Sequence, residues 1–449
     1  MKELAIPFQS IGALLSDHAI NHPDKTAIHD LDSGVSMDFA ELRGAVERIA
    51  AQLEHLGVRP GDRVALLCDE RLEKLLNFLA IWRAGAVACP FHVESGIDHL
   101  RAILGHINPS LVLLHQDLRE ILPASDEIIP IGDWNPANQS PGLFSMMAGV
   151  PGDAIAAAAN KPGDIASIFS TSGTTDRPKC VVWDHLGLWL CGLSTIDFTA
   201  MTGEDRILEY RTFSWLSPQI ITLMPFLATG LTIYMARRFS RRRFFDWIRD
   251  HGITVAVGVP TVINMLLSKP VAVTGDDLPS LRLMTSSSAP LAPDQWRDFE
   301  ELYKIRLLQF YGASEGGWLC GNRHDNRKLG TAGMPAKHMD LAIIDDDGQI
   351  CPPGIEGEIT IRGPQTAVAT IAPDGINEDR SRFRLTERGR CGDLGVMDAD
   401  GFVTVTGRVK DLIIRGEVNI APLEIDGVVM RHEKIHEAAA VGTPRRHPW

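Results

Sequence analysis

The sequence predicts an α/β protein, with two stacked α/β lobes and a β-barrel-like lobe in a large N-terminal domain, followed by a truncated small C-terminal domain. Three observations favour this fold class. At 449 residues, the chain is too long for one ordinary hydrophobic core. Between residues 62 and 310, β-branched runs alternate with amphipathic helical stretches, as in parallel sheets covered by helices. After about residue 341, strand patterns dominate.

The first α/β repeat consists of a strand pattern at 62–68, apolar side chains at helical spacing over 71–84, and a second strand pattern at 86–91. Further strands are expected at 111–114, 165–169, 231–235, 253–259, 281–284 and 305–310. The β-rich part should contain strands at 341–345 and 358–362, and a hairpin at 395–406 that turns at 398–401. A strand at 412–414 and a helix from Pro422 complete the pattern.

Composition excludes several classes of function. The net charge of -13 disfavours a broad surface for DNA or RNA. The basic cluster at 237–243 could be an anion or membrane patch, but a helix start is favoured because the apolar residues after it have helical spacing. Seven cysteines without a Cys-x-x-Cys pair predict reduced thiols and no zinc site. No leader or membrane span is evident, so we expect a cytoplasmic protein.

A loop rich in small hydroxyl residues follows the strand at 165–169. Residues 170–179 read Ser-Thr-Ser-Gly-Thr-Thr-Asp-Arg-Pro-Lys. Backbone N–H groups, hydroxyl groups and one lysine suit the oxygens of a triphosphate. The pattern is not G-x-x-x-x-G-K-[ST], so a P-loop nucleotide hydrolase is disfavoured. Taken alone, the segment could also be a plain surface turn.

Three other segments place polar groups after expected strands. Residues 309–315 read Gln-Phe-Tyr-Gly-Ala-Ser-Glu, in which Tyr311 suits a purine ring and Glu315 suits Mg²⁺. Residues 286–291 are small and permit close approach of a ligand to the backbone. The fourth segment pairs Gly-Asp-Leu-Gly at 392–395 with Gly-Arg at 407–408. Each segment alone also has a purely structural explanation.

In this order, the four segments resemble those of the adenylate-forming superfamily, which includes acyl-CoA synthetases, adenylation domains of peptide synthetases and luciferases. Those proteins carry a Thr-Ser-Gly-Thr-Thr-Gly-x-Pro-Lys loop, and only Asp176 departs from it here, in place of the last glycine. An acid beside a triphosphate adds repulsion, so we expect weaker nucleotide binding than is usual. The resemblance covers nearly the whole chain.

The resemblance implies binding of ATP and Mg²⁺ and assigns residues to them. The phosphates are expected at Thr171, Ser172, Gly173, Thr174, Thr175 and Lys179. The adenosine and α-phosphate are expected along Ser288, Ala289, Pro290, Tyr311, Gly312, Ala313 and Ser314. Asp393 should accept the ribose hydroxyls, and Arg408 should contact ribose and phosphate. Thr174 and Glu315 are the expected metal ligands, and with Lys179 they are the expected catalytic residues.

The implied reaction is attack of a carboxylate on the α-phosphorus of ATP, followed by transfer of the acyl group to coenzyme A (CoA). The expected domains are an AMP-binding adenylation core at 1–409, and a hinge and incomplete C-terminal domain at 410–449, with Lys410 at the hinge. The family's Val-Gly-x-Pro-Asp run breaks after Pro444, and its distal lysine motif does not occur in this sequence. Glu417 stands where the family has a glycine beside the pantetheine channel. We therefore expect that the chain binds ATP and Mg²⁺ but completes the two-step ligase reaction slowly or not at all.

The identity of the substrate carboxylic acid is the property that the sequence indicates least clearly. By the same resemblance, the wall of the acyl pocket includes residues 210–219, where the family's frequent histidine is missing. The residues expected to line the pocket are Phe213, Trp215, Gly258, Gly312, Gly316 and Trp318. Two tryptophans favour a small to medium aryl, alicyclic or acyl acid, although core packing explains these aromatic residues nearly as well.

Three functions remain in competition. The leading one is an AMP-forming acyl-CoA synthetase that acts on a small-molecule acid. The second is a degenerate module that binds nucleotide or acyl-adenylate without turnover, which the preserved Lys179, Glu315, Asp393 and Arg408 disfavour. The third is a stand-alone adenylation domain that loads a carrier protein. The oligomeric state, a homodimer included, stays open.

Overall fold

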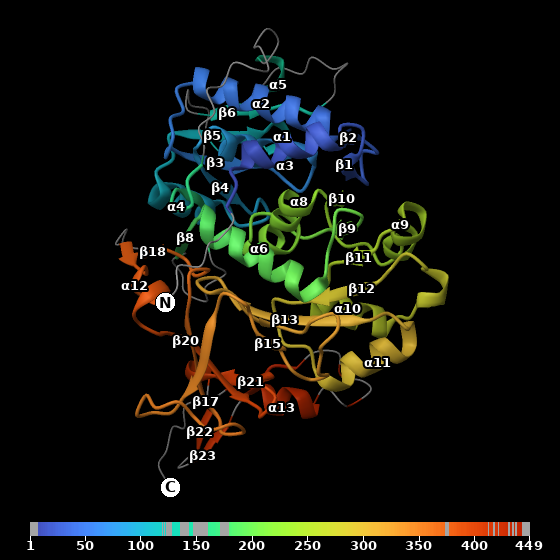
Figure 1. Ribbon diagram of the computed structural model, residues 1–449, viewed down its shortest axis with the longest axis vertical. Coiled ribbons are helices and arrows are strands. Elements are labelled where there is room, and N and C mark those ends of the chain that lie inside the picture. The colour runs from blue at the N-terminus through green and yellow to red at the C-terminus, as the bar shows by residue number, and fades with distance from the viewer. Residues whose placement is uncertain are drawn as a thin grey trace.

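The computed structural model shows three lobes, each with its own sheet (Figure 1). It describes residues 8–118, 120, 122, 128–134, 143–146, 160–170, 179–372, 377–411, 413–415, 418–420, 422–429, 432, 435 and 438–441. The predicted fold class, α/β with two large lobes and a β-rich lobe, is confirmed.

In the described part of the chain, the first lobe has an eight-stranded sheet of order β19-β18-β8-β7-β4-β3-β5-β6. Its strands are β3 (Arg63–Leu67), β4 (Val87–Phe91), β5 (Leu111–His115), β6 (Ile128–Ile131), β7 (Ile165–Ser170), β8 (Cys180–Asp184), β18 (Ala369–Ile371) and β19 (Asn377–Asp379). The strands from β7 to β6 run parallel, and β8 turns back against β7. Helices α2 (Phe39–His55) and α3 (Leu72–Arg83) pack on one face, and α4 (Ile97–Ile107) packs on the other.

The second lobe, among the same described residues, has a nine-stranded sheet of order β15-β14-β13-β12-β11-β9-β10-β1-β2. Its strands are β1 (Thr26–Asp30), β2 (Ser36–Asp38), β9 (Arg206–Glu209), β10 (Thr232–Met235), β11 (Val255–Ala256), β12 (Leu283–Ser286), β13 (Leu307–Ala313), β14 (Gly317–Gly321) and β15 (Met334–Pro335). The helices are α1 (Ile11–Asn21), α6 (His185–Thr199), α7 (Leu216–Pro218), α8 (Met224–Thr229), α9 (Phe244–His251), α10 (Pro260–Ser268) and α11 (Pro293–Tyr303). The N-terminal β1 joins this sheet beside β10.

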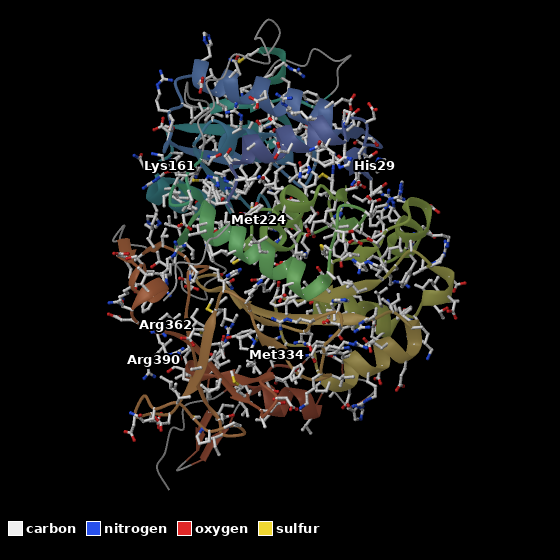
Figure 2. All side chains as sticks on the ribbon, viewed as in Figure 1. His29, Lys161, Met224, Met334, Arg362 and Arg390 are labelled. Carbon is white, nitrogen blue, oxygen red and sulfur yellow. The ribbon has the colours of Figure 1, made fainter. Side chains whose placement is uncertain are left out.

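The third lobe is the β-rich part that the sequence predicts after about residue 341. Within the described ranges, its sheet has the strands β16 (Asp340–Ile344), β17 (Gly357–Arg362), β20 (Gly389–Met397) and β21 (Val403–Arg408) in antiparallel order. Figure 2 places Arg362 and Arg390 on this lobe. A hairpin of β22 (Ile413–Arg415) and β23 (Val418–Ile420) follows, and α13 (Pro422–Val429) lies against β21. The short α5 (Leu143–Met146) and α12 (Arg382–Leu385) complete the named helices of the described segments.

Helix α6 runs between the two large sheets (Figure 1) and is buried on nearly all sides. A Cβ atom on Gly192 would lie 2.3 Å from the Cβ of Met224, so α8 packs so closely against α6 that only glycine fits at this position. Figure 2 shows Met224 near the middle of the molecule. The Oγ1 of Thr195 donates to the carbonyl of Ile220 at 2.7 Å and accepts from Nε1 of Trp318 at 2.9 Å. Helix α6 is therefore joined to its neighbours in the second lobe by both close packing and hydrogen bonds.

The N-terminus of α6 is tied to the third lobe. Asp184 caps the helix by accepting the N–H of Gly187 at 2.8 Å, and it forms a buried ion pair with Arg384 at 2.6 Å. A carboxylate at a helix N-terminus is stabilised by the helix dipole, and the arginine supplies the charge that burial requires.

Several predicted elements differ from those observed. The strand predicted at 253–259 is reduced to β11 because the chain must change direction before Pro260, which begins α10. β13 continues past residue 310 because its antiparallel partner β14 extends it. The helix-start interpretation of the basic cluster is confirmed, since α9 begins directly after it with Phe244, Phe245, Trp247 and Ile248 buried. No described helix is long and apolar enough to cross a membrane.

His185, at the start of α6, gives the fold a testable pH dependence. Burial lowers the pKa of His185 to about 4, and its ring packs edge-on against Trp82. An unfolded histidine has a pKa of about 6.5, so the unfolded state binds the proton first and stability falls as pH drops from about 6.5 towards 4. We expect His185 to account for about 2 kcal/mol of lost unfolding free energy between about pH 7.5 and pH 5.

Urea unfolding of the wild type and His185→Gln at the two pH values would measure this contribution. The variant should lose less stability on acidification, whereas a variant of the exposed His22, His22→Gln, should behave like the wild type. Equal losses in the wild type and His185→Gln would contradict the assignment.

Candidate active site

Three of the four predicted segments follow strands of the two large sheets, and the fourth lies on β20 and β21 of the third lobe. β7 ends at Ser170, β12 at Ser286 and β13 at Ala313. Ligands of α/β proteins commonly bind beyond the carboxyl ends of parallel strands. Five residues expected to bind phosphate lie outside the described residues, namely Thr171, Ser172, Gly173, Thr174 and Thr175. The two ends of their loop are fixed by the register of Ser170 opposite Cys180 in the β7–β8 pair.

The first and second segments meet through a charge pair. Nζ of Lys179 lies 3.1 Å from Oε1 of Glu315, and both side chains are partly exposed, at 37% and 29%. The turn that carries Glu315 is held at its backbone, since Nε1 of Trp183 donates to the carbonyl of Ser314 at 3.1 Å. The N–H of Ala367 donates to the carbonyl of Glu315 at 2.9 Å. The backbone is therefore fixed while the carboxylate faces solvent.

The second and fourth segments meet at Asp393. Its Oδ2 accepts the hydroxyl of Tyr311, and its Oδ1 accepts Nε of Arg408 at 3.1 Å. Asp393 and Arg408 are paired residues of β20 and β21, so sheet register brings them together. Burial, together with the nearby Cys391 and Asp393, raises the pKa of Tyr311, so its hydroxyl stays a proton donor.

The third segment lies open to solvent. Ser288, Ala289 and Pro290 are exposed directly after β12. Ser288 has φ +74°, a left-handed conformation that costs a non-glycine residue on the order of 1–3 kcal/mol and that clusters at functional sites. Gly312 is also exposed, whereas Ala313 and Ser314 are partly buried. A Cβ on Gly312 would lie 2.4 Å from the carbonyl oxygen of Gly317, so no side chain fits there.

The residues expected to line the acyl pocket have different environments. Phe213 and Trp318 are buried, whereas Trp215 is 48% exposed and stacks on His92 with 5.2 Å between ring centroids. The glycines are required by packing. A Cβ on Gly258 would lie 2.3 Å from the carbonyl oxygen of Thr285, and one on Gly316 would clash with the side chains of Leu319 and Ile361.

Lys410 is exposed in a short 3-10 helix at Val409–Asp411, and Glu417 lies outside the described residues. Glu70 and Lys74, which were not predicted from the sequence, contact the backbone and side chains of residues 212–214. The signal for Lys74 is hidden because α3 is buried on all faces, so its apolar spacing does not mark this lysine as buried.

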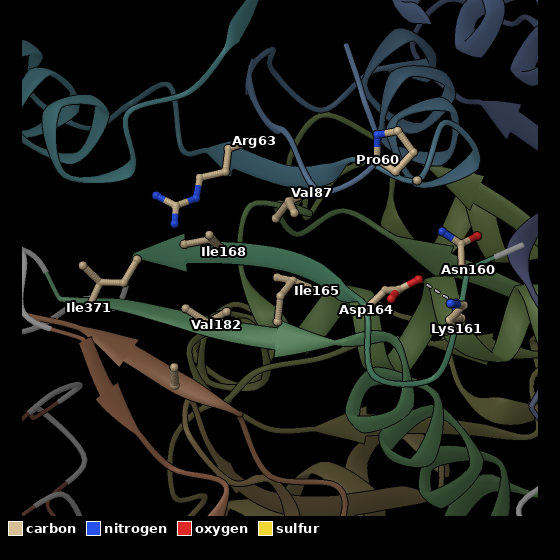
Figure 3. A pocket seen from close by; sticks show the side chains of 13 residues that line it. Pro60, Arg63, Val87, Asn160, Lys161, Asp164, Ile165, Ile168, Val182 and Ile371 are labelled. Carbon is tan, nitrogen blue, oxygen red and sulfur yellow. Dashed lines mark hydrogen bonds between the residues drawn. The ribbon is translucent and has the colours of Figure 1, made fainter. Parts of the chain in front are cut away.

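A groove of about 590 Å³ lies elsewhere, on the first sheet (Figure 3). Apolar residues such as Val87, Ile165 and Ile168 line it together with Arg63 and Asn160. The groove reaches from Arg63 and Val87, which begin β3 and β4, to Ile168 and Ile371, near the carboxyl end of β7. None of the residues that line the groove belongs to the four predicted segments.

Comparisons with known proteins agree with the geometry. A family model described as AMP-binding enzyme matches residues 15–369. The sulfoacetate–CoA ligase of Cupriavidus necator is 30% identical, over 97% of this chain and 86% of that protein. ATP-bound MatB from Rhodopseudomonas palustris has a TM-score of 0.88 at 27% identity, over 98% of this chain and 86% of that one.

The O-succinylbenzoate CoA synthetase MenE from Bacillus subtilis, solved with ATP and a magnesium ion, has a TM-score of 0.82 at 25% identity, over 96% of this chain and 87% of that one. The family match includes the phosphate loop and the segment that carries Tyr311 and Glu315. The chain therefore belongs to the AMP-binding enzyme family, as an adenylate-forming enzyme of the AMP-dependent acyl-CoA synthetase type.

Proposed function

We propose that this enzyme activates a carboxylic acid with ATP to give an acyl-adenylate and pyrophosphate, and then transfers the acyl group to the thiol of CoA. The observation that carries the proposal is that segments far apart in sequence contact one another. Lys179 forms an ion pair with Glu315, and Tyr311 and Arg408 both donate hydrogen bonds to Asp393. The CoA-ligase names of the relatives support CoA as the thiol.

Asp393 is the proposed acceptor of the ribose hydroxyls. An ionised carboxylate has about four lone-pair sites, and Tyr311 and Arg408 occupy two of them. Two sites remain for hydroxyl donors. The hydrogen bonds from Arg408 and Tyr311 fix the orientation of the carboxylate. Tyr311 itself then stands beside the proposed adenine site.

Lys179 and Glu315 are proposed at the phosphate end. The described residues contain no group of three or more His, Cys, Asp or Glu side chains that could hold a metal. Glu315 fits Mg²⁺ because this ion is usually bound by one or two carboxylates together with substrate phosphates. Its Oε2 makes no hydrogen bond to a described residue, so this oxygen is available to a cation. Bound Mg²⁺ would neutralise charge on the phosphate oxygens.

The adenylation step needs alignment and charge neutralisation. An oxygen of the substrate carboxylate forms a bond to the α-phosphorus while the bond to the pyrophosphate oxygen breaks. Because both reactants are anions, the cation of Lys179 lowers the repulsion between them. We further propose that residues 1–409 form the core for this step and that Lys410, exposed just after Arg408, lies at a hinge to the segment that follows.

The finer proposal is a small to medium aryl, alicyclic or acyl acid. The acids named for the relatives differ widely, from sulfoacetate to O-succinylbenzoate, so the acid must be found by experiment. ATP–pyrophosphate exchange with a panel of such acids tests adenylation, and thioester formation with CoA tests the second step. Absence of exchange with every acid would overturn the proposed function.

Removing the charge of Asp393 should weaken nucleotide binding. Asp393→Asn keeps the shape but loses charge-assisted hydrogen bonds worth about 1.5–3 kcal/mol, so the Kd for AMP should rise by about ten- to a hundredfold. Calorimetric titration with AMP measures this change. Asp400→Asn, on the exposed β20–β21 turn, is the control and should bind like the wild type. An unchanged Kd in Asp393→Asn would refute the ribose assignment.

Removing the charge of Glu315 should affect catalysis more than AMP binding. Glu315→Gln should lower the rate of pyrophosphate exchange about a hundredfold or more, because the carboxylate acts on phosphates and metal, while the Kd for AMP without Mg²⁺ stays near the wild-type value. The exposed Glu301 on α11 provides the control variant, Glu301→Gln. Exchange at the wild-type rate in Glu315→Gln would exclude the metal role.

A further inference from the structure

Two cations contact the wall proposed for the acyl group, Lys74 from α3 and Arg211 within the wall itself, and each has its own buried carboxylate. Lys74 pairs with Glu70 at the start of α3, and their side chains are 0% and 8% exposed. Arg211 pairs with Glu209 at the end of β9, with exposures of 8% and 0%. Both pairs contact the segment between β9 and α7, which belongs to residues 210–219.

Lys74 and Glu70 hold this segment from the neighbouring lobe. Oε2 of Glu70 accepts the N–H of Phe213 at 3.0 Å, and its Oε1 accepts the hydroxyl of Thr212. Lys74 donates to Oγ of Ser214 at 2.8 Å and to Oγ1 of Thr212 at 3.3 Å. With Glu70 as its third acceptor, all three N–H groups of the Lys74 ammonium have partners. α3 packs on the first sheet, so these bonds cross between lobes (Figure 1).

The second pair is equally complete. Nε and Nη2 of Arg211 donate to the two oxygens of Glu209 at 2.9 and 2.7 Å. Nη1 donates to Oγ of Ser217 at 2.8 Å. Glu209 also accepts the hydroxyl of Thr222 at 2.8 Å. The guanidinium is thus neutralised and bonded within the second lobe.

Other charges near the start of α3 bond elsewhere. Arg71 pairs with Asp69, Asp117 and Asp133, and Glu73 accepts the N–H of Trp134. None of these four contacts reaches residues 212–214. Among the described residues, the wall is therefore held by ions whose charges cancel in pairs.

Such a wall is a poor environment for a second anion. Transfer of an anion from water to a buried site is costly unless a cation or several donors compensate it. Lys74 and Arg211 are cations, but each already has a carboxylate partner at contact distance. An anionic substrate tail would meet no net positive charge and would have to compete with Glu70 or Glu209.

We propose that Glu70 is a specificity-determining residue, because it neutralises Lys74 and so makes the acyl wall uncharged. The enzyme then selects acids whose only charge is the reacting carboxylate, and it rejects acids that carry a second anionic group. This inference rests on the proposed function, because it takes residues 210–219 as the acyl wall. Glu70 is a positioning residue, because it acts through Lys74 and the segment 212–214.

Matched pairs of acids test the proposal by selectivity rather than by activity. Succinamate and succinate form the aliphatic pair, and 4-carbamoylbenzoate and terephthalate form the aryl pair. Within each pair the tails have nearly the same shape, but one is a neutral amide with N–H donors and the other is an anionic carboxylate. The wild type should prefer the amide, with kcat/KM for pyrophosphate exchange about tenfold higher or more. The pair closer to the best acid of the panel is used.

Glu70→Gln keeps the shape and an acceptor but leaves the charge of Lys74 uncompensated. The ratio of kcat/KM for diacid to amide should rise about tenfold. The double variant Glu70→Gln/Lys74→Met is neutral again and should return to the wild-type ratio. Asp246→Asn, beside Arg249 on the exposed face of α9, is the matched control on the surface and should change nothing. A merely structural role of Glu70 would lower both rates without changing their ratio.

Two outcomes would overturn the proposal. One is a wild type that uses the diacid as well as the amide, and the other is an active Glu70→Gln with an unchanged ratio. If Glu70→Gln does not fold, Glu209→Gln frees Arg211 in the same way, and an unchanged ratio there overturns the proposal too. Failure of the proposed function is distinguishable, since then the wild type exchanges pyrophosphate with no acid at all.

Discussion

The packing of α6 between the two large sheets is the constraint on which the rest of the structure depends. The helix is buried on nearly every side, so each contact must be shaped for a neighbour in a different layer. Gly192 lets α8 approach, Thr195 bonds to residues of the second lobe, and Asp184 pairs with Arg384 near the third lobe. A core of this kind specifies one arrangement of the layers, because a small shift would break several bonds at once.

This arrangement explains how residues far apart in sequence can form one site. Trp183 lies at the end of the strand that leads into α6, and its indole holds the turn before Glu315. Asp393 comes from a different sheet, where strand register places Arg408 beside it. The site therefore combines a rigid backbone with partly exposed polar ends, which is suited to a ligand that brings its own charges.

Much of the fold could be read from the sequence because its strongest signals are local. The predicted strand at 86–91 and helix at 71–84 differ from β4 and α3 by one residue at an end, since apolar spacing reports burial directly. The five-residue π-helix at Gln219–Leu223 had no comparable signal. It is stabilised by tertiary contacts, such as the bond from Oγ1 of Thr195 on α6 to the carbonyl of Ile220.

The candidate site shows the same division. Tyr311, Glu315, Asp393 and Arg408 could be named because their segments resemble those of a known family, but the contacts among them depend on the tertiary fold. Phe213 and Trp318 could not be separated from core residues by sequence, since an aromatic side chain suits either environment. Lys74 could not be found at all, because an isolated lysine in a helix is usually on the surface.

The local character of the two wall ion pairs has a consequence for how this enzyme can diversify. Glu70 and Lys74 are one helical turn apart, and Glu209 and Arg211 are separated by a single residue. Each pair is thus a self-contained unit within a few residues of chain, and none of its members is part of the contacts around Asp393 or Glu315. With the proposed site assignments, a substitution in one pair changes which acids are accepted and leaves the proposed nucleotide site intact, so substrate range and adenylation chemistry can evolve separately.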